Sequence, residues 1–359
     1  MKYLNALNKI NGLGPQKMRT LLSFFETPEN IWQASIVDLE KSGIGPAITQ
    51  KIVSERPAIN PDAEWERLAK ENIRMITQND PAYPRLLKEI SPAPYIIYMK
   101  GKIDLNAAPM ISIVGSRKYT SYGAQAATSF AKDLAAAGIT VVSGMALGID
   151  SIAHSGALLA GGKTVAVLGG SLDDKNIYPR NNFNLSRDII VQGALLSDYP
   201  IETPAGIPGN FPARNRIIAG LSLGTLVVEA GEKSGTLITA TLALEFNREV
   251  FAVPGSIFSP QSIGTHNLIR NGAKIVTGVK DILEELDLDE MQEKTAPIAK
   301  IPETKEEEII LKILSTDPLH IDNISFRSKL DTSAVSASLS MMEIKGWTKN
   351  IGGQNYILI

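Results

Sequence analysis

The sequence predicts an α/β protein built on a doubly wound parallel sheet, preceded by a helical region and followed by a winged helix. Two observations carry this prediction. Short apolar, β-branched segments alternate with helical segments between residues 110 and 279, as in parallel sheets covered by helices. Residues 1 to about 75 and residues 306–359 lack this alternation and are mainly helical in pattern, with a Gly352-Gly353 hairpin turn near the end.

The central region, residues 76–284, contains seven candidate strands and three long candidate helices. The strands are expected at 110–114, 140–143, 164–168, 194–197, 225–228, 249–253 and 274–276, and the helices at 122–137, 149–160 and 237–246. Gly138 and Gly161 follow two of these helices. Glycine commonly ends a helix because it adopts the left-handed conformation without strain.

The flanking regions differ from the centre in pattern and charge. In residues 1–75, two Gly-x-Gly-Pro turns, at 12–15 and 43–46, each precede an amphipathic helix with proline at its favoured first position. Residues 285–305 are acidic and aperiodic, so we expect a linker there. The stretch 281–310 has 11 acidic and 3 basic residues, a net charge of −8, which leaves +6 on the rest of a chain whose net charge is −2. The winged helix, residues 306–359, should have helices at 306–315, 321–328 and 332–345 and a terminal hairpin.

Composition excludes several kinds of site. The chain has no cysteine, and its 3 histidines are far apart, so disulfides, thiolate zinc sites and iron–sulfur clusters are ruled out, and we expect no metal or cofactor. No apolar segment approaches the ~18 residues of a membrane span. Residues 1–13 lack the apolar core of a signal peptide. We therefore expect a cytoplasmic protein that does not bind membranes.

Glycine and hydroxyl residues follow most of the predicted strands. Ligands of parallel α/β sheets bind at the carboxyl ends of the strands, where glycine lets backbone N–H groups approach an anion and helix N-termini add positive charge. We therefore predict a phosphate-binding pocket, although turn formation alone is an alternative role for each glycine. The loop residues of this pocket are Gly115, Ser116, Gly144, Ala146, Gly148, Gly169, Gly170, Ser234, Gly235 and Thr236.

Arginine, aromatic and amide side chains lie near the same strand ends. They are Arg117, Arg180, Arg214 and Arg216, then Tyr178, Phe183 and Phe211, and finally Asn182 and Asn215. Planar guanidinium groups suit phosphates, and several of them from separate loops favour a polyanion over a single nucleotide. The interleaved rings could stack on unpaired bases, but packing within the loops explains each ring equally well.

The residues do not form a convincing enzymatic site. Gly115-Ser116-Arg117 is not the G-x-G-x-x-G of dinucleotide-binding folds, and no acidic residue ends the second strand. Asp150 and His154 are one helical turn apart and could pair, but Asp150 begins a helix, where capping and packing are the more ordinary roles. Glu229 ends a strand and is the best single carboxylate for catalysis, without a clear partner.

Longer motifs resemble the DNA-processing protein A family, also called Smf, over almost the whole chain. The matching segments are 79–87, 113–117, 143–150 with Ala153 and His154, 211–222, 234–240 and 248–255. The resemblance implies an extended Rossmann-like core that is not an enzyme. Such proteins bind single-stranded DNA, protect incoming strands during natural transformation and load the RecA recombinase. The resemblance also implies that Arg117 and Arg180 hold DNA, and that the core forms a homodimer, for which we consider apolar positions near Leu242 and Leu268.

Three alternatives stay open. The Gly-x-Gly-Pro turns resemble helix–hairpin–helix motifs of a SAM-like helical domain, which would hold phosphates, but a packing module fits equally well. Residues 332–339 of the winged helix contain no Arg or Lys, so we predict protein contact or packing there over duplex binding. The core also faintly resembles nucleoside-monophosphate phosphoribohydrolases. It lacks their Glu after Gly235-Thr236, which leaves nucleotide hydrolysis as the alternative function.

Overall fold

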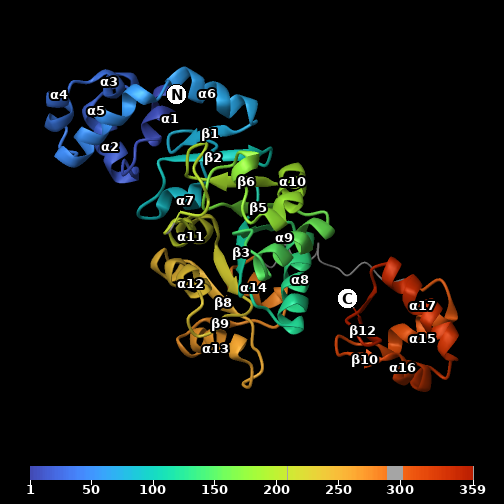
Figure 1. Cartoon of the computed structure of the whole chain (residues 1–359). Coiled ribbons are helices and arrows are strands. Elements are labelled where there is room, and N and C mark those ends of the chain that lie inside the picture. The colour runs from blue at the N-terminus through green and yellow to red at the C-terminus, as the bar shows by residue number, and fades with distance from the viewer. Residues whose placement is uncertain (208, 289–301, 359) are drawn as a thin grey trace. The chain divides into compact units, whose positions relative to one another are not determined.

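The computed structural model describes residues 1–207, 209–288 and 302–358. The described helices and strands form two compact units, one from Lys2 to Glu285 and the other from Lys305 to Leu358 (Figure 1). Most of the expected linker, 285–305, lies outside the described residues. The exact domain boundaries therefore remain predictions.

A nine-stranded sheet forms the centre of the larger unit. Its strands are β1 (Arg74–Thr77), β2 (Ile96–Gly101), β3 (Met110–Val114), β4 (Thr140–Ser143), β5 (Thr164–Val167), β6 (Ala194–Ser197), β7 (Gly224–Val227), β8 (Glu249–Ala252) and β9 (Lys274–Ile275). They lie in the order β1-β2-β6-β5-β4-β3-β7-β8-β9, and β3 to β9 are parallel. The predicted α/β class is confirmed, and each predicted strand matches an observed one to within one residue at either end.

β1 and β2, which were not predicted, extend the sheet in the antiparallel direction. β1 pairs with β2, and β2 pairs with β6, with Tyr98 opposite Ser197. These two strands lack the alternation with long helices that identified the others, because antiparallel neighbours need no helical crossover. The sheet is therefore mostly parallel with a two-stranded antiparallel edge.

Helices cover both faces of this sheet. They are α7 (Arg85–Glu89), α8 (Ser121–Ala136), α9 (Ile149–Leu159), α10 (Phe183–Gln192), α11 (Asn210–Leu221), α12 (Thr236–Glu245), α13 (Ile263–Arg270) and α14 (Val279–Glu285). Ile111 and Ile113 of β3 belong to a core cluster with α8 and α9. Met110 and Val114, which point to the opposite face, belong to a cluster with α11 and α12. The three predicted helices of this region are confirmed as α8, α9 and α12.

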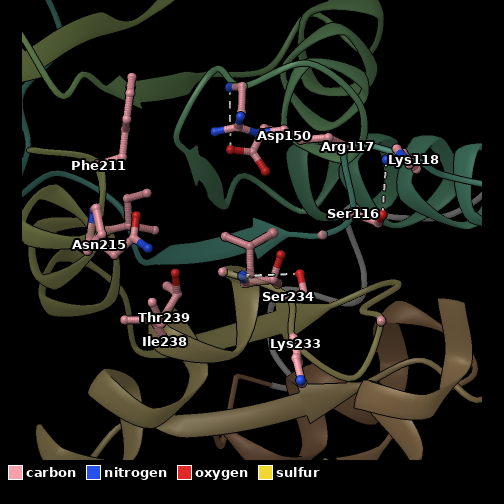
Figure 2. Close-up of a pocket in the computed structure, with 18 of the residues that line it drawn as sticks. Ser116, Arg117, Lys118, Asp150, Phe211, Asn215, Lys233, Ser234, Ile238 and Thr239 are labelled. Atoms are coloured by element: carbon pink, nitrogen blue, oxygen red, sulfur yellow. Dashed lines mark hydrogen bonds between the residues drawn. The ribbon is translucent and has the colours of Figure 1, made fainter. Parts of the chain in front are cut away.

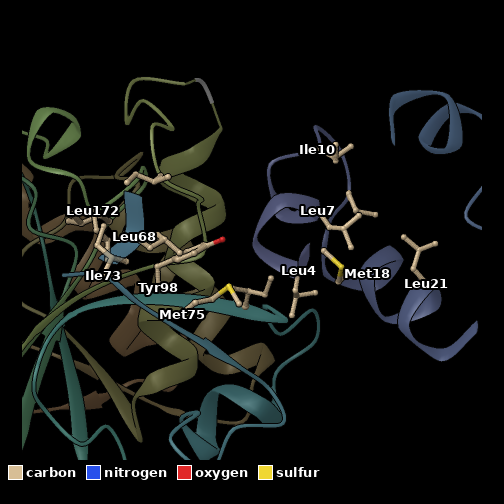
Figure 3. Close-up of a cluster of buried hydrophobic side chains, with 14 of the residues drawn as sticks. Leu4, Leu7, Ile10, Met18, Leu21, Leu68, Ile73, Met75, Tyr98 and Leu172 are labelled. Atoms are coloured by element: carbon tan, nitrogen blue, oxygen red, sulfur yellow. The ribbon is translucent and has the colours of Figure 1, made fainter. Parts of the chain in front are cut away.

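Six helices precede the sheet and share a hydrophobic cluster with it. They are α1 (Lys2–Asn8), α2 (Pro15–Phe24), α3 (Pro28–Gln33), α4 (Ile36–Lys41), α5 (Pro46–Glu55) and α6 (Pro61–Lys70). Pro15 and Pro46 begin α2 and α5, as the two Gly-x-Gly-Pro turns predict. Figure 3 shows side chains of these helices and of β1 and β2 within the same cluster, among them Leu4, Met75 and Tyr98.

The smaller unit has the predicted helices and terminal hairpin of a winged helix, together with one short strand, β10, that was not predicted. They are α15 (Lys305–Ile313), β10 (Leu319–His320), α16 (Ile321–Ser328), α17 (Thr332–Ile344), β11 (Thr348–Asn350) and β12 (Asn355–Leu358). Strands β11 and β12 form the expected hairpin, with Thr348 opposite Leu358. Ile324 and Leu339 lie in the core of this unit.

Candidate functional site

A pocket of about 530 Å³ lies where β3 and β7 end. From β3 the chain passes through β4, β5 and β6 on one side of the sheet, and from β7 through β8 and β9 on the other. The direction of winding therefore reverses between β3 and β7. Such switch points are where open α/β sheets bind ligands, so the topology itself marks this pocket as the candidate site.

Three segments contribute most of the residues that line this pocket (Figure 2). They contribute Gly115, Ser116, Arg117 and Lys118 after β3, then Phe211, Arg214 and Asn215 on α11, and finally Lys233, Ser234, Gly235 and Thr236 at the start of α12. Ala146 and Asp150 lie at the pocket from the β4 side. Ten of the residues that the sequence analysis selected thus meet in one cavity.

Helix α11 separates two arginines that look equivalent in the sequence. Arg214 and Asn215 follow Phe211 by three and four residues, so both lie on the same side of the helix as Phe211, and this side lines the pocket. Arg216 points elsewhere and forms an ion pair with Asp198, with 2.5 Å between Nη2 and Oδ2. The structure therefore does not bring Arg216 to the pocket, because the helix that sets its direction was not predicted.

Arg214 forms part of the pocket floor. Its side chain is buried, and its Nη1 donates hydrogen bonds to the carbonyl oxygens of Gly144, at 2.8 Å, and Val167. Burial lowers the pKa of Arg214 to about 10, with Asp150 opposing and Arg117 adding to the shift. A Cβ at position 144 would lie 2.6 Å from the guanidinium, which explains the glycine there. Arg214 is thus a fixed internal charge.

Asp150 and His154 have separate partners. The Asp150 carboxylate accepts hydrogen bonds from the N–H groups of Gly144, at 3.1 Å, and Ala146, at 3.4 Å, and burial raises its pKa. His154 Nδ1 lies 2.6 Å from Thr164 Oγ1, and burial lowers the pKa of His154 to about 3. Asp150 therefore shapes the turn after β4, and His154 is a neutral core residue.

Three cations of the pocket are free to meet a ligand. Arg117, Lys118 and Lys233 are exposed and line the cavity, and their side chains form no hydrogen bond or ion pair with any residue that the structure describes. The Arg117 guanidinium lies over the Phe211 ring, 6.0 Å from its centroid. Lys118 and Lys233 were not among the predicted site residues, although both are sequence neighbours of predicted ones, Arg117 and Ser234.

A rim of rings and cations continues from the pocket. Tyr178 lies beside Phe211, with 5.8 Å between ring centroids, and about half of its surface is exposed. Arg180 is exposed and lies over Phe183, 4.6 Å from that centroid. Its Nη1 donates to the Asp174 carbonyl at 2.6 Å. Tyr178 and Arg180 are not pocket-lining residues, so they form an outer surface reached through Phe211.

The remaining selected residues pack around the pocket without lining it. Gly148 has a positive φ of 92°, and a Cβ there would lie 2.5 Å from the Ser116 carbonyl oxygen. Cβ atoms at Gly169 and Gly170 would crowd Phe211 and Ala205. Asn182 Nδ2 donates to the Met145 carbonyl at 2.9 Å. These positions require small or polar side chains for packing.

Glu229 is not available as a free carboxylate. It is buried, and its Oε2 accepts from the Thr120 N–H at 2.9 Å while Oε1 accepts from the Thr120 hydroxyl at 2.6 Å. Thr120 in turn caps α8. The partner that the sequence did not reveal is therefore structural. Within the described ranges, no cluster of histidine and carboxylate side chains is arranged to hold a metal ion, and no helix has the length and apolarity needed to cross a membrane.

Comparisons with known proteins find similar sequences and structures. Residues 74–287 match the family model of DNA recombination-mediator protein A, and residues 294–354 match that of the DprA winged helix domain. Protein Smf of Synechocystis sp. is 37% identical over 391 residues, which cover 99% of this chain and 98% of that protein.

Two solved structures are also similar. That of DNA processing protein A from Streptococcus pneumoniae has a TM-score of 0.67 and 37% identity, and the match covers 79% of this chain and 98% of that one. A structure concerning the single-stranded DNA binding mode of DNA processing protein A from Helicobacter pylori has a TM-score of 0.54 and 31% identity, over 60% of this chain and 96% of that one.

Proposed function

This chain belongs to the DNA recombination-mediator protein A family, and on that premise we propose that it binds single-stranded DNA through the switch-point pocket and its rim. The relative from Helicobacter pylori is described as binding single-stranded DNA, and relatives from Streptococcus pneumoniae and Bacillus subtilis are named DNA processing proteins. We propose the same activity here, in natural transformation or recombination.

The observation that carries this proposal is the sequence of contacts from Arg117 to Phe211 to Tyr178. The Arg117 guanidinium lies over the Phe211 ring, and the Phe211 ring neighbours Tyr178. Exposed rings stack on unpaired bases, whereas the base faces of a duplex are already stacked. Guanidinium groups beside those rings bind the phosphates that link the bases. The arrangement therefore supports preference for a single strand.

We propose that this binding is not accompanied by catalysis. The phosphoribohydrolase alternative relies on Glu229, and the carboxylate of Glu229 is occupied by Thr120. Position 239, where those enzymes carry Glu after Gly-Thr, is a threonine in this chain. These two facts support a binding protein over a hydrolase.

The decisive experiment measures affinity for a fluorescent oligonucleotide by anisotropy. The double variant Arg117→Ala/Arg180→Ala should lose at least about tenfold in affinity, because two charge-assisted phosphate contacts disappear. Arg270→Ala, which removes an exposed arginine at the end of α13, is the matched control and should bind normally. Circular dichroism confirms that each variant is folded. Unchanged binding by the double variant, or stronger binding of duplex than of single strand, would contradict the proposal.

We further propose that the bound strand is delivered to the RecA recombinase in the cytoplasm by a homodimer of the core. Leu242 and Leu268, considered for the dimer, are partly buried against the α11–α12 core cluster. RecA filament formation on single-stranded DNA covered by a single-strand binding protein should speed up when this protein is added. Sedimentation velocity gives the oligomeric state. No acceleration of filament formation would remove the RecA part of the proposal and leave the DNA-binding part intact.

A further inference from the structure

The rim segment, residues 171–180, carries Tyr178 and Arg180 and shares a hydrophobic cluster with the helical region that precedes the sheet. Its residues Leu172 and Ile177 are buried, with exposures of 1% and 2%, in the same cluster as side chains of α1 and α6 (Figure 3). Tyr178 and Arg180, in contrast, are exposed. The position of these two exposed side chains therefore depends on the contacts that hold the inner residues of the segment.

Asp173 is a buried carboxylate inside the rim segment, with an exposure of 1%. Its Oδ1 accepts hydrogen bonds from the Ser171 hydroxyl, at 2.6 Å, and from the Glu202 N–H, at 3.1 Å. Its Oδ2 accepts one from Asn176 Nδ2 at 2.8 Å. A buried carboxylate is costly without such donors. The backbone of Glu202 therefore helps to fix the interior of the rim segment.

The Glu202 carboxylate reaches the helical region. Its Oε2 lies 2.7 Å from Arg67 Nη1 on α6 and 3.7 Å from Lys9 Nζ at the end of α1, and its Oε1 lies 3.2 Å from Lys175 Nζ. Burial acts to raise the pKa of Glu202, but the three cations outweigh burial and lower this pKa. Glu202 therefore connects the two parts of the molecule, with its carboxylate on the helical region and its N–H group on the rim segment.

The contacts of Glu202 form a network and not a single surface ion pair. Lys9 and Arg67 each pair with Glu64 as well, whose side chain is 9% exposed. An isolated exposed pair contributes little to stability, whereas several charges that share partners hold one another in place. Lys175 is 67% exposed and is the weakest partner in this network. The link from Glu202 therefore runs mainly to α1 and α6.

The backbone at position 202 is in a conformation that residues with a Cβ rarely adopt. The φ of Glu202 is 70°, which lies in the left-handed region where glycine is the ordinary choice. Glycine would relieve the strain but would remove the carboxylate. The contacts of the glutamate side chain therefore explain why a strained residue occupies this turn.

We propose that Glu202 is a positioning residue for DNA binding, through which the helical region holds Tyr178 and Arg180 beside Phe211. This inference rests on the proposed function and goes beyond it by assigning a role to the helical region, for which the Gly-x-Gly-Pro turns left two alternatives open. The helical region acts on the bound strand without touching it, because the rim segment transmits the contact.

The first test separates positioning from the effect of charge alone. Glu202→Gln removes a negative charge near the proposed DNA surface, which by itself would strengthen the binding of a polyanion. Positioning predicts the reverse, a loss of about fivefold in affinity for a fluorescent single strand, less than the loss of one whole charge-assisted contact. Glu285→Gln is the matched control, because Glu285 is 34% exposed against 39% for Glu202 and pairs with Lys274 at 2.7 Å. It should not weaken binding.

The second test asks whether Glu202 acts through the rim. In a Tyr178→Ala/Arg180→Ala background the pocket can still bind the strand, but the rim no longer contributes. Glu202→Gln should then change the affinity less than about twofold, because the two effects are coupled. Arg67→Gln, which leaves Glu202 in place, should also lower the affinity only when the rim is intact. Circular dichroism confirms that each variant is folded.

The outcomes distinguish this inference from the proposed function. Unchanged or stronger binding by Glu202→Gln would overturn the positioning role while DNA binding still stands. The same loss in both backgrounds would also overturn it, since Glu202 would then act on the protein as a whole and not on the rim. Absence of binding by the wild type would overturn the proposed function, and the positioning role with it.

Discussion

The Nζ atom of Lys100 lies 2.9 Å from a carboxylate oxygen of Asp174, and this contact positions the outer rim of the candidate site. Lys100 is almost buried on β2, and Nζ also lies 3.1 Å from Glu71. The Asp174 carbonyl in turn accepts the hydrogen bond from Arg180. An ammonium group inside the sheet edge therefore holds the segment that presents Arg180.

We expect Lys100→Met to weaken both the fold and the rim. Removing the ammonium leaves Glu71 without its partner, whereas Asp174 keeps an ion pair with Arg187. Both carboxylates are partly exposed, so the cost should be about 1–2 kcal/mol, less than for a fully buried pair. Affinity for single-stranded DNA should fall several-fold. Urea unfolding and anisotropy measure the two effects. Lys175→Met, which removes an exposed neighbour, should change neither by much, and equal effects of the two variants would refute this role of Lys100.

Gly148 should be intolerant of any side chain. Its φ of 92° strains an alanine, and the new Cβ would press on the Ser116 carbonyl and the Arg117 backbone. Gly161→Ala is the matched control, because φ is 70° there and the space is open. We expect Gly161→Ala to cost about 1–2 kcal/mol through strain alone, with normal DNA binding. Gly148→Ala should cost more and should also lower affinity, and identical behaviour of the two would contradict the proposed contact.

His154 should make the protein sensitive to acid. Burial lowers its pKa to about 3 in the folded state, from about 6.5 for an exposed histidine, so the folded state binds the proton less readily than the unfolded one. Stability is therefore present above pH 6.5 and falls as the pH drops below it, by at most about 1.4 kcal/mol per unit. His154→Asn keeps a donor towards Thr164 and removes the titration. Urea unfolding between pH 7.5 and 4.5 should show a shallower loss in the variant, and parallel curves would rule out His154 as the cause.

Glu229→Gln should disturb the fold and not an enzymatic reaction. The amide replaces a carboxylate that accepts two hydrogen bonds from Thr120, and losing a charge-assisted bond costs about 1.5–3 kcal/mol. Thermal denaturation measures this loss. Chromatography of a nucleoside monophosphate incubated with either protein should show no free base. Base release by the wild type that disappears in the variant would favour the hydrolase instead.

The parallel strands and their helices could be predicted because several signals coincide there. A segment such as Met110–Val114 is fully buried, so it is a continuous apolar run, and glycine follows it. β2 is also an apolar run, between Pro94 and Gly101, but it was missed together with β1 because neither strand alternates with a long helix. α11 was missed for a different reason. The helix is buried on several sides, with both Arg214 and Ile217 buried, so its sequence shows no clear polar face. In addition, Pro212 lies in its first turn, and a proline is easily taken as a sign of a loop.

The sequence could predict which strand ends form the candidate site, but not which side chains point into the pocket. Arg214 and Arg216 differ only in their position around a helix, and that position decides between the pocket floor and an ion pair with Asp198. Lys233 could be identified as a site residue only from the structure, which places it at the pocket without a hydrogen bond or ion pair to any described residue.

Helix α11 supplies the ring that borders the rim, the guanidinium of the floor and the amide of Asn215, all within twelve residues. Its other side reaches Asp198, whose carbonyl accepts a hydrogen bond from Asn8 of α1. One short segment of the gene thus encodes several pocket residues together with the contact to Asp198 that orients the helix. Exchanging that segment between relatives would transfer a matched set of contacts, which makes α11 a natural module for grafting altered ligand preference onto an unchanged scaffold.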